Sequence, residues 1–221
     1  MTRTLILSGG GRYADPWHPF AATSARIAAI AESLGHEVEV AEELEERLVD
    51  LDGVDVVAVN AADGPVTDAH EAAAAGIHAF LARGGGVLAI HVGASNLIGM
   101  PDWETVTGMK WVTGVSMHPP LGPSHVLVHP ERHVIAAPLH DFDLLDERYC
   151  HLRLAPDLAP FVSHDHDGTA EPLVWARTRG RARVVTDALG HGVESYDSPE
   201  HRELLLRSFR WLTGTLTSTA E

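Results

Sequence analysis

The sequence predicts an α/β fold with a doubly wound, mostly parallel sheet and helices on both of its faces. Three largely apolar runs, at positions 4–8, 54–60 and 86–91, are typical of strands buried on both faces. The segments 22–34 and 67–83 repeat their apolar residues with the period of an amphipathic helix. Strands that alternate with helices in this way form a parallel sheet through crossover connections.

Local signals mark the ends of these elements. Gly35 ends the first helix, at the position after a helix where glycine is common. Residues 36–41 alternate polar and apolar side chains, which predicts a half-covered edge strand. A second glycine run, 84–86, ends the helix before it and begins the strand that delivers His91 into a turn.

The second half of the chain follows a different pattern, which predicts an antiparallel β-rich extension. Residues 124–129 alternate as an antiparallel strand does when one face is solvated. An exposed turn is expected at 164–168, and Ser198 is expected to cap the last helix. Further strands are predicted at 158–163, 172–177 and 181–186.

Length and composition fit one globular domain over residues 1–214, followed by a flexible tail over 215–221. The chain has 221 residues, of which 45% are hydrophobic, so it can bury a sizeable core. It shows no signal-peptide pattern and no apolar run long enough to cross a bilayer. The single cysteine, Cys150, excludes an internal disulfide. We therefore expect a cytoplasmic protein with no membrane partner.

The charge balance excludes another class of partner. Sixteen Lys and Arg residues against 31 Asp and Glu residues give a formal net charge of -15. Nucleic-acid binding requires clustered basic residues that neutralise phosphates, so no nucleic-acid partner is expected. Many sheets of this kind dimerise, so a homo-oligomer stays open.

Fifteen histidines are an unusual number for this chain, and four of them occupy positions where α/β proteins bind ligands. They follow predicted strands or lie in loops: His18, His91, His118 and His191. The carboxyl ends of parallel strands share one edge of a sheet, where ligands usually bind. The segment 141–149 adds two acids, Asp146 and Glu147. We expect these side chains to converge on one site.

Two kinds of chemistry fit this set of residues. Neutral imidazoles can bind zinc or a similar divalent ion, with His91, His118 and His191 as the candidate ligands. No H-x-x-x-H or H-x-x-E-H pair is present, so a metal site depends on convergence of distant residues. The alternative is acid–base catalysis on a polyol or keto-sugar, with His91, Glu147 and His191 as catalytic residues.

Aromatic side chains can supply the apolar faces on which sugar rings stack. The candidates are Trp17, Trp103, Trp111, Tyr149 and Trp175. We expect three of them to shape a sugar pocket: Trp17, Tyr149 and Trp175. His18 and Asp146 are expected to contact the substrate beside them.

Two other motifs are assigned no ligand. The glycines at 9–11 follow the first strand, but the dinucleotide spacing G-x-G-x-x-G is absent, so a phosphate site is not expected. The run at 164–167 has the composition of a ligand cluster, yet its position in a predicted hairpin turn indicates solvated surface.

Several motifs also occur in an order that is specific as a set. They are Gly84-Gly-Gly-Val-Leu-Ala-Ile-His91, His118-Pro119, and the segments 133–139, 146–149, 172–175, 180–184 and 189–191. On these motifs the chain resembles the ThuA-like (trehalose utilisation) family, a branch of the class I glutamine amidotransferase-like superfamily. The resemblance implies a flavodoxin-like sheet and a role in sugar metabolism.

The resemblance does not imply glutamine hydrolysis. Amidotransferases need a cysteine nucleophile at the turn after this strand, activated by a histidine. Here the turn carries His91, and Cys150 lies in a different segment. We therefore expect a protein of this fold without glutaminase activity.

Two functional hypotheses follow. The first is a carbohydrate-active enzyme, a hydrolase, lyase or isomerase, that acts on a 3-keto-glycoside or a related oxidised sugar. The second is a non-catalytic sugar-binding or regulatory module on the same fold. Both take a small-molecule carbohydrate as their ligand and leave its exact identity open.

Overall fold

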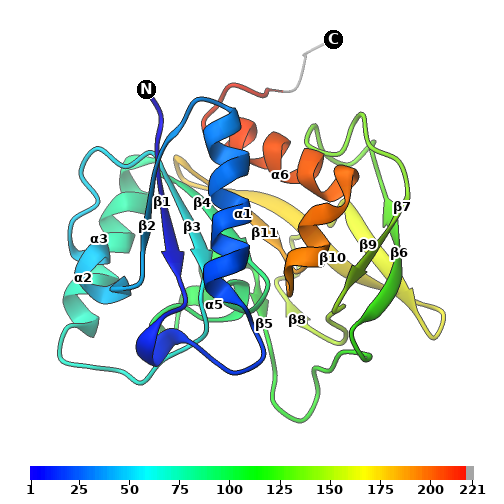
Figure 1. Cartoon of the computed structure of the whole chain (residues 1–221), viewed down its shortest axis with the longest axis horizontal. Coiled ribbons are helices and arrows are strands. Elements are labelled where there is room, and N and C mark those ends of the chain that lie inside the picture. Colours follow the sequence, from blue (N-terminus) through cyan, green and yellow to red (C-terminus); the bar gives the residue numbers. More distant parts are fainter. Residues whose placement is uncertain (218–221) are drawn as a thin grey trace.

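The first half of the chain alternates strands and helices, as the sequence predicts. The structure is a computed structural model that describes residues 1–217 (Figure 1). Its elements up to the site are β1 (Arg3–Ser8), η1 (Gly11–Tyr13), α1 (Phe20–Ser33), β2 (Glu37–Ala41), α2 (Leu44–Val49), β3 (Val56–Asn60), α3 (His70–Arg83), β4 (Gly86–Ile90) and α4 (Val92–Ser95).

The second half contains short helices and the antiparallel strands of the extension. The elements are α5 (Trp103–Thr107), β5 (Met109–Lys110), β6 (Gly122–Val128), β7 (Phe142–Asp146), β8 (Arg153–Leu154), β9 (Val162–His166), β10 (Thr169–Arg179), β11 (Ala182–Asp187), η2 (Val193–Asp197) and α6 (Pro199–Leu212). The predicted turn at 164–168 is wrong in extent. Only Asp167 and Gly168 have a positive φ there, 51° and 79°, and a two-residue hairpin turn lets β9 continue to His166.

Nine strands form one sheet in the order β2-β1-β3-β4-β11-β10-β9-β6-β7. The strands from β2 to β11 are parallel, and their order is that of a flavodoxin-like sheet. From β11 outward each neighbour is antiparallel. The predicted fold class, a mostly parallel doubly wound sheet with an antiparallel extension, is confirmed.

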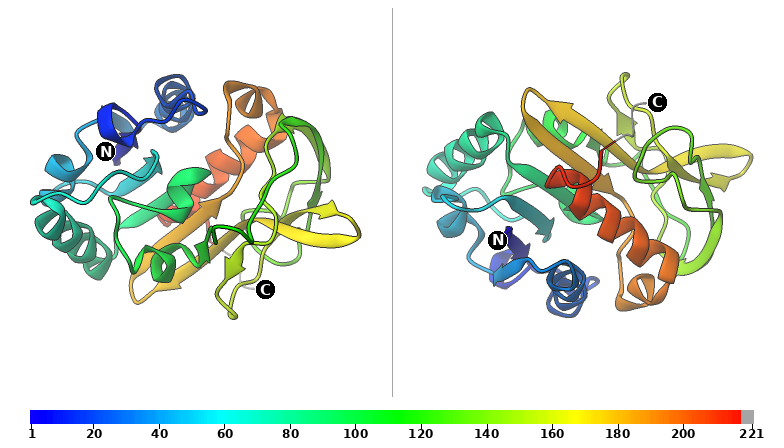
Figure 2. Two further views of the ribbon diagram at one scale, coloured as in Figure 1. Left: turned by 90° about the horizontal axis from the view of Figure 1, so that it is seen from below. Right: turned by 90° about the horizontal axis from the view of Figure 1, so that it is seen from above.

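The core lies on both sides of the parallel strands. Residues 5–7 of β1, 56–59 of β3 and 87–90 of β4 are fully buried, which explains their apolar runs. Figure 2 shows α1 and α6 on one face of the sheet and α3 and α5 on the other. Strand β2, at the edge, is largely exposed and alternates in polarity, as predicted.

The last helix begins as predicted. Ser198 caps α6 by accepting a hydrogen bond from the backbone N–H of His201, and Pro199 follows it. Within residues 1–217 no helix combines the length and apolar character needed to cross a membrane. Of the predicted tail 215–221, residues 218–221 lie outside the described part of the chain.

Strand direction brings distant loops to one edge of the sheet. Strands β1, β4 and β11 are parallel, so the loops that follow them begin at the same edge. Four antiparallel pairings separate β11 from β7, so β7 runs in the same direction as β11. The residues directly after β7, including Glu147, therefore join the loops that carry His18, His91 and His191.

Candidate functional site

His91 stands at the turn between β4 and α4 with a strained backbone, φ 48° and ψ -121°. Its backbone N–H donates a hydrogen bond of 2.7 Å to the carbonyl oxygen of Asp187, the last residue of β11. Gly93 lets the turn pack closely against β3, because a Cβ at this position would lie 2.6 Å from the carbonyl oxygen of Val59. These contacts fix the position of the His91 imidazole.

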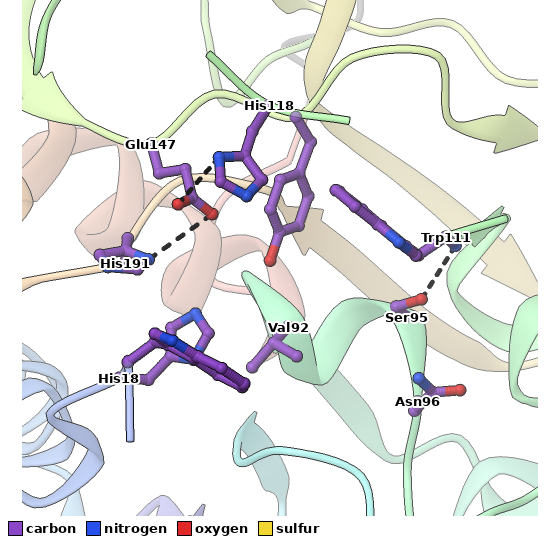
Figure 3. A pocket seen from close by; sticks show the side chains of 10 residues that line it. His18, Val92, Ser95, Asn96, Trp111, His118, Glu147 and His191 are labelled. Carbon is purple, nitrogen blue, oxygen red and sulfur yellow. Dashed lines mark hydrogen bonds and ion pairs between the residues drawn. The ribbon is translucent and has the colours of Figure 1, made fainter. Parts of the chain in front are cut away.

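Four side chains from four segments meet at this edge: His18, His91, Glu147 and His191. One nitrogen or oxygen atom from each lies within 4.8 Å of the corresponding atoms of the others. His191 Nδ1 is 3.2 Å from His91 Nε2, and both nitrogens are 3.6 Å from Glu147 Oε1. Figure 3 shows His191 and His118 on either side of Glu147. The predicted convergence of the histidines and Glu147 is therefore present in the structure.

Hydrogen bonds fix the proton on two of the imidazoles. His91 Nδ1 donates to the carbonyl oxygen of Ala188 at 2.9 Å, and His18 Nδ1 donates to the Asp15 carboxylate at 2.7 Å. Because these partners only accept, the neutral form of each ring carries its proton on Nδ1 and presents the lone pair of Nε2 to the cluster. His18 Nε2 is buried, and no group within residues 1–217 forms a hydrogen bond with it.

The charges of the cluster are coupled. Burial raises the pKa of Glu147, but His191 and His91 outweigh that effect and hold it well below its usual range. Glu147 in turn raises the pKa of His191. Burial, together with the neighbouring His91, lowers the pKa of His18. The site therefore contains an ionised carboxylate among imidazoles.

A cavity of about 550 Å³ opens above the cluster. Its lining residues are Trp17, His18, Val92, Ser95, Asn96, Trp111, His118, Glu147, Tyr149 and His191. The Tyr149 ring stacks on His91 with centroids 4.4 Å apart, and Trp111 meets Tyr149 edge-on at 4.9 Å. Trp17, 72% exposed, stands at the rim. The cavity thus has aromatic walls, formed by Trp17, Trp111 and Tyr149. Its polar floor is the cluster of His18, Glu147 and His191, with His91 buried behind them.

Asp146 does not reach this cavity, so its predicted contact with substrate is wrong. The side chain is buried and accepts hydrogen bonds from the backbone N–H groups of Gly190 and His191, at 2.7 and 3.1 Å. It also accepts a hydrogen bond of 2.7 Å from the Ser195 hydroxyl. A carboxylate enclosed by such donors holds the loop that carries His191.

A second buried chain of polar groups lies beneath the site. His201 Nδ1 is 2.9 Å from Ser195 Oγ, and His201 Nε2 is 3.0 Å from Asp187 Oδ2. Burial lowers the pKa of His201, but the attraction of Asp187 outweighs it and the net shift is upward. These residues have the identities of a hydrolase triad, yet all three are at most 1% exposed, so substrate has no access. Their role is to join α6 to the end of β11.

Two further predicted residues differ from their predicted placement. Trp175 is wrong as a pocket residue, because it is fully buried in β10 and its indole N–H donates to the carbonyl oxygen of Thr107. His118, predicted as a metal ligand, lies outside the four-residue cluster. Its Nδ1 is 3.1 Å from the other oxygen of Glu147, Oε2, and its side chain is 41% exposed.

Sequence reasoning missed several residues of the site. Asp15 orients His18 from three positions earlier in the same loop, and that D-x-x-H spacing was the available signal. Trp111 lines the cavity, although the sequence predicts only Trp17, Tyr149 and Trp175 in the sugar pocket. Ser95 and Asn96 carry no motif, so only the fold could place them in the cavity wall.

Cys150 is not a nucleophile at this site. It is fully buried, does not line the cavity, and its Sγ is 3.8 Å from His164 Nε2. Burial raises the pKa of the thiol to about 11, so the reactive thiolate is scarce at neutral pH. His164 is itself fully buried, which corrects its prediction as solvated surface.

A family model decides how this chain is related to known proteins. The model described as "ThuA: Trehalose utilisation" matches residues 3–212. The chain belongs to the ThuA family. A ThuA-like protein from Parabacteroides merdae superposes with a TM-score of 0.81 at 17% identity, covering 100% of this chain and 92% of that one. One from Bacteroides uniformis gives 0.77 at 19% identity, covering 98% and 93%.

The fold also resembles that of the glutamine amidotransferases. A protein described as a GMP synthase component from Thermoplasma acidophilum superposes with a TM-score of 0.52 at 16% identity. The match covers 97% of this chain and 98% of that one. A comparison with curated proteins finds no match. At these identities the structural matches establish the shared fold and nothing about the reaction.

Proposed function

We propose that the protein is an enzyme of carbohydrate metabolism that acts on an oxidised sugar, such as a 3-keto-glycoside. The observation that carries this proposal is the placement of Glu147 among imidazoles at the floor of an aromatic-walled cavity. Glu147 and His191, which line the cavity, form the proposed catalytic centre together with His91, which is 1% exposed and reaches it through His191 and Glu147. The family description, trehalose utilisation, supports a sugar as the substrate class.

The cavity has the size and lining of a sugar site. A volume of about 550 Å³ falls within the usual range for small-molecule pockets. Trp17 and Trp111 offer flat apolar faces for the ring, while Ser95 and Asn96 offer polar groups for its hydroxyls. A keto-sugar presents both kinds of surface, so its chemistry matches that of the walls.

The floor can carry out the first step on such a substrate. A ketone acidifies the hydrogen on the neighbouring carbon. An imidazole that lines the cavity, His118 or His191, accepts that proton while the electron pair moves onto the ketone oxygen as an enolate. Glu147 stabilises the imidazolium, since His118 and His191 both lie beside it. Return of the proton to the opposite face of that carbon gives an epimer, the product of an isomerase. Alternatively, the C–O bond of a glycosidic oxygen on the next carbon breaks, the oxygen leaves with the proton, and an unsaturated ketone remains, which is the product of a lyase or of the first stage of a hydrolase.

The proposal includes the absence of glutaminase activity. The turn that carries the cysteine nucleophile in amidotransferases holds His91 here, and an imidazole at this place forms no thioester. Cys150, buried and with a raised thiol pKa, does not replace that cysteine. A single free cysteine also fits a cytoplasmic setting, which we include in the proposal.

A non-catalytic sugar-binding or regulatory module is the second candidate. The aromatic walls favour it, because Trp17, Trp111 and Tyr149 can bind a sugar whether or not the floor reacts. The two candidates differ in what the floor residues contribute. In an enzyme they change the rate of a reaction, whereas in a binding module they change only affinity.

The test is turnover of 3-keto-glycosides by the purified protein and by the His91→Ala variant, followed by mass spectrometry of the products. We expect consumption by the wild type and a loss of about 100-fold or more in the variant. His125→Ala, which removes an exposed histidine paired with Asp143, is the matched control and should react like the wild type. No turnover by the wild type, with equal sugar binding before and after His91→Ala, would leave the binding module as the function.

A further inference from the structure

The four side chains at the cavity floor have the composition and spacing of a metal site. We propose that His18 Nε2, His91 Nε2, His191 Nδ1 and one Glu147 oxygen bind a single divalent transition-metal ion, with zinc as the representative ion. This ligand set differs from the one expected from sequence, since His18 and Glu147 take the place of His118. The inference deepens the proposed function, and it rests on that function for what the ion does.

The distances fit ligands that share one ion. Zinc lies about 2.0–2.2 Å from imidazole nitrogen and carboxylate oxygen, which puts tetrahedral ligand atoms about 3.3 Å from one another. The three pairs that join His91, His191 and Glu147 are separated by 3.2, 3.6 and 3.6 Å. A ring nitrogen of His18 completes a set of four ligand atoms in which every pair lies within 4.8 Å. Binding thus requires only small side-chain movements.

The hydrogen bonds of His18 and His91 are those of metal ligands. A ligating histidine typically donates its other ring N–H to a carboxylate or carbonyl oxygen. His18 does so to Asp15, and His91 does so to the carbonyl oxygen of Ala188. As neutral rings, both direct the lone pair of Nε2 into the cluster, and the groups that orient them are already in place.

His18 Nε2 provides an independent reason. A buried polar atom without a hydrogen-bond partner is unfavourable, and an ordered water or a bound ion is a common explanation for one. Within residues 1–217 this nitrogen has no partner, although its ring centroid lies 4.5 Å from that of His191 and 5.1 Å from that of His91. A proton on His191 Nδ1 can satisfy His91 Nε2, but nothing comparable reaches His18 Nε2. A metal ion gives this lone pair a partner.

Three imidazoles and one carboxylate select the class of ion. Nitrogen-rich sets suit zinc, iron, nickel and copper, whereas magnesium and calcium prefer oxygen ligands. His118 lies next to Glu147 Oε2. The other carboxylate oxygen, Oε1, faces the nitrogens of His91 and His191. The set therefore favours a transition-metal ion over magnesium or calcium.

The position of the site gives the ion a role in the proposed reaction. His18, Glu147 and His191 line the cavity, so an ion held between them lies next to bound substrate. There it polarises a carbonyl or hydroxyl oxygen of the sugar. His118 stays outside the ligand set, 41% exposed, and is the imidazole that remains free to move a proton.

The experiment is calorimetric titration of the full-length, chelator-treated protein with ZnCl₂ in the absence of sugar. We expect one tight site in the wild type. Asp15→Asn keeps the ligands but removes the carboxylate that orients His18, and should weaken affinity by about tenfold to 100-fold. His18→Ala and Glu147→Gln each remove a ligand and should weaken it further. Circular dichroism of each metal-free variant checks that it is folded.

Surface histidines bind zinc weakly, so His125→Ala is the matched control and should keep the wild-type affinity. Substitution with Co²⁺ adds a spectroscopic readout, since its visible absorption reports coordination by protein ligands. The proposal is overturned if the wild type lacks a tight site, or if the cluster variants bind as the wild type does. Turnover of keto-glycosides by protein without zinc binding would overturn the metal site alone and leave the proposed function standing.

Discussion

At the scale of single residues, His91 has a backbone conformation that its residue type rarely adopts. Its φ of 48° belongs to a region that residues with a side chain rarely adopt, and such strain costs about 1–3 kcal/mol. The strain places a buried imidazole between Tyr149 and His191, at the end of a fully buried strand. Strained backbone of this kind clusters at functional sites, where the surrounding structure over-determines it.

This strain predicts an unusual order of stabilities. Glycine normally destabilises a protein relative to alanine by about 0.5–1 kcal/mol, because it loses more backbone entropy on folding. At position 91 the order should reverse, since glycine accepts a positive φ without strain. We expect His91→Gly to be more stable than His91→Ala by about 1 kcal/mol, measured by urea unfolding.

Ala28 of helix α1 supplies the control for this comparison. Its replacement by glycine should show the ordinary order, with a loss of about 0.5–1 kcal/mol relative to the wild type. If His91→Gly is also less stable than His91→Ala, the turn is not strained in solution.

At the scale of elements, the sequence predicts what depends on neighbours in the chain. The buried strands β1, β3 and β4 follow from continuous apolar runs, and the start of α6 follows from Ser198 and Pro199. The turn at His91 was also predictable, because a strand ends there before a glycine. These signals are local, so they can be recognised in the sequence without knowledge of the fold.

The errors concern residues whose surroundings come from distant segments. Trp175 looked like a pocket residue, but its environment is set by Thr107, 68 positions away. His18 belongs to the four-residue cluster and His118 lies outside it, because the positions of both depend on two long loops. Asp146 and Glu147 are adjacent in sequence, yet only Glu147 lines the cavity. No period or spacing in the sequence contains this information.

Gly93 is the position where one element depends most sharply on another. An added Cβ would lie 2.6 Å from the carbonyl oxygen of Val59, and backbone cannot move aside as a flexible side chain can. We expect Gly93→Ala to push α4 away from β3 and to lower the free energy of unfolding by about 1–3 kcal/mol. Chemical denaturation measures this loss.

Gly122 in β6 is the matched control. The nearest atom to a Cβ built there is 3.7 Å away, an ordinary contact, so Gly122→Ala should change stability by no more than about 0.5 kcal/mol. Equal effects of the two substitutions would show that α4 does not pack against β3 as described.

At the scale of the whole molecule, one corner joins the antiparallel extension to the parallel half. The His133 ring stacks on Phe161 at 5.0 Å and meets Trp211 of α6 at 5.1 Å. Arg207 of α6 donates hydrogen bonds to the carbonyl oxygens of Val134 and Ile135. This corner keeps the extension, and with it Glu147, in register with the strand ends that carry the histidines.

The same corner predicts a loss of stability in acid. Burial lowers the pKa of His133 from 6.5 to about 4, so the folded state favours the neutral ring. Its contribution is fully present above pH 6.5, the unfolded value, and is lost as pH falls toward 4. After discounting for partial exposure, we expect this loss to be of the order of 2 kcal/mol. His133→Gln should show a correspondingly shallower decline in unfolding free energy over this range, and parallel curves would contradict the assignment.

The central claim is that the cluster around Glu147 at the cavity floor catalyses a reaction of the sugar, whereas the aromatic walls bind the sugar. Steady-state kinetics on a 3-keto-glycoside, measured for Glu147→Gln beside Trp17→Ala, test it most directly. We predict that Glu147→Gln lowers kcat by about 100-fold or more with little change in KM, whereas Trp17→Ala raises KM and largely keeps kcat. If Glu147→Gln changes only KM, or leaves turnover intact, the cluster of imidazoles around Glu147 is not the catalytic centre.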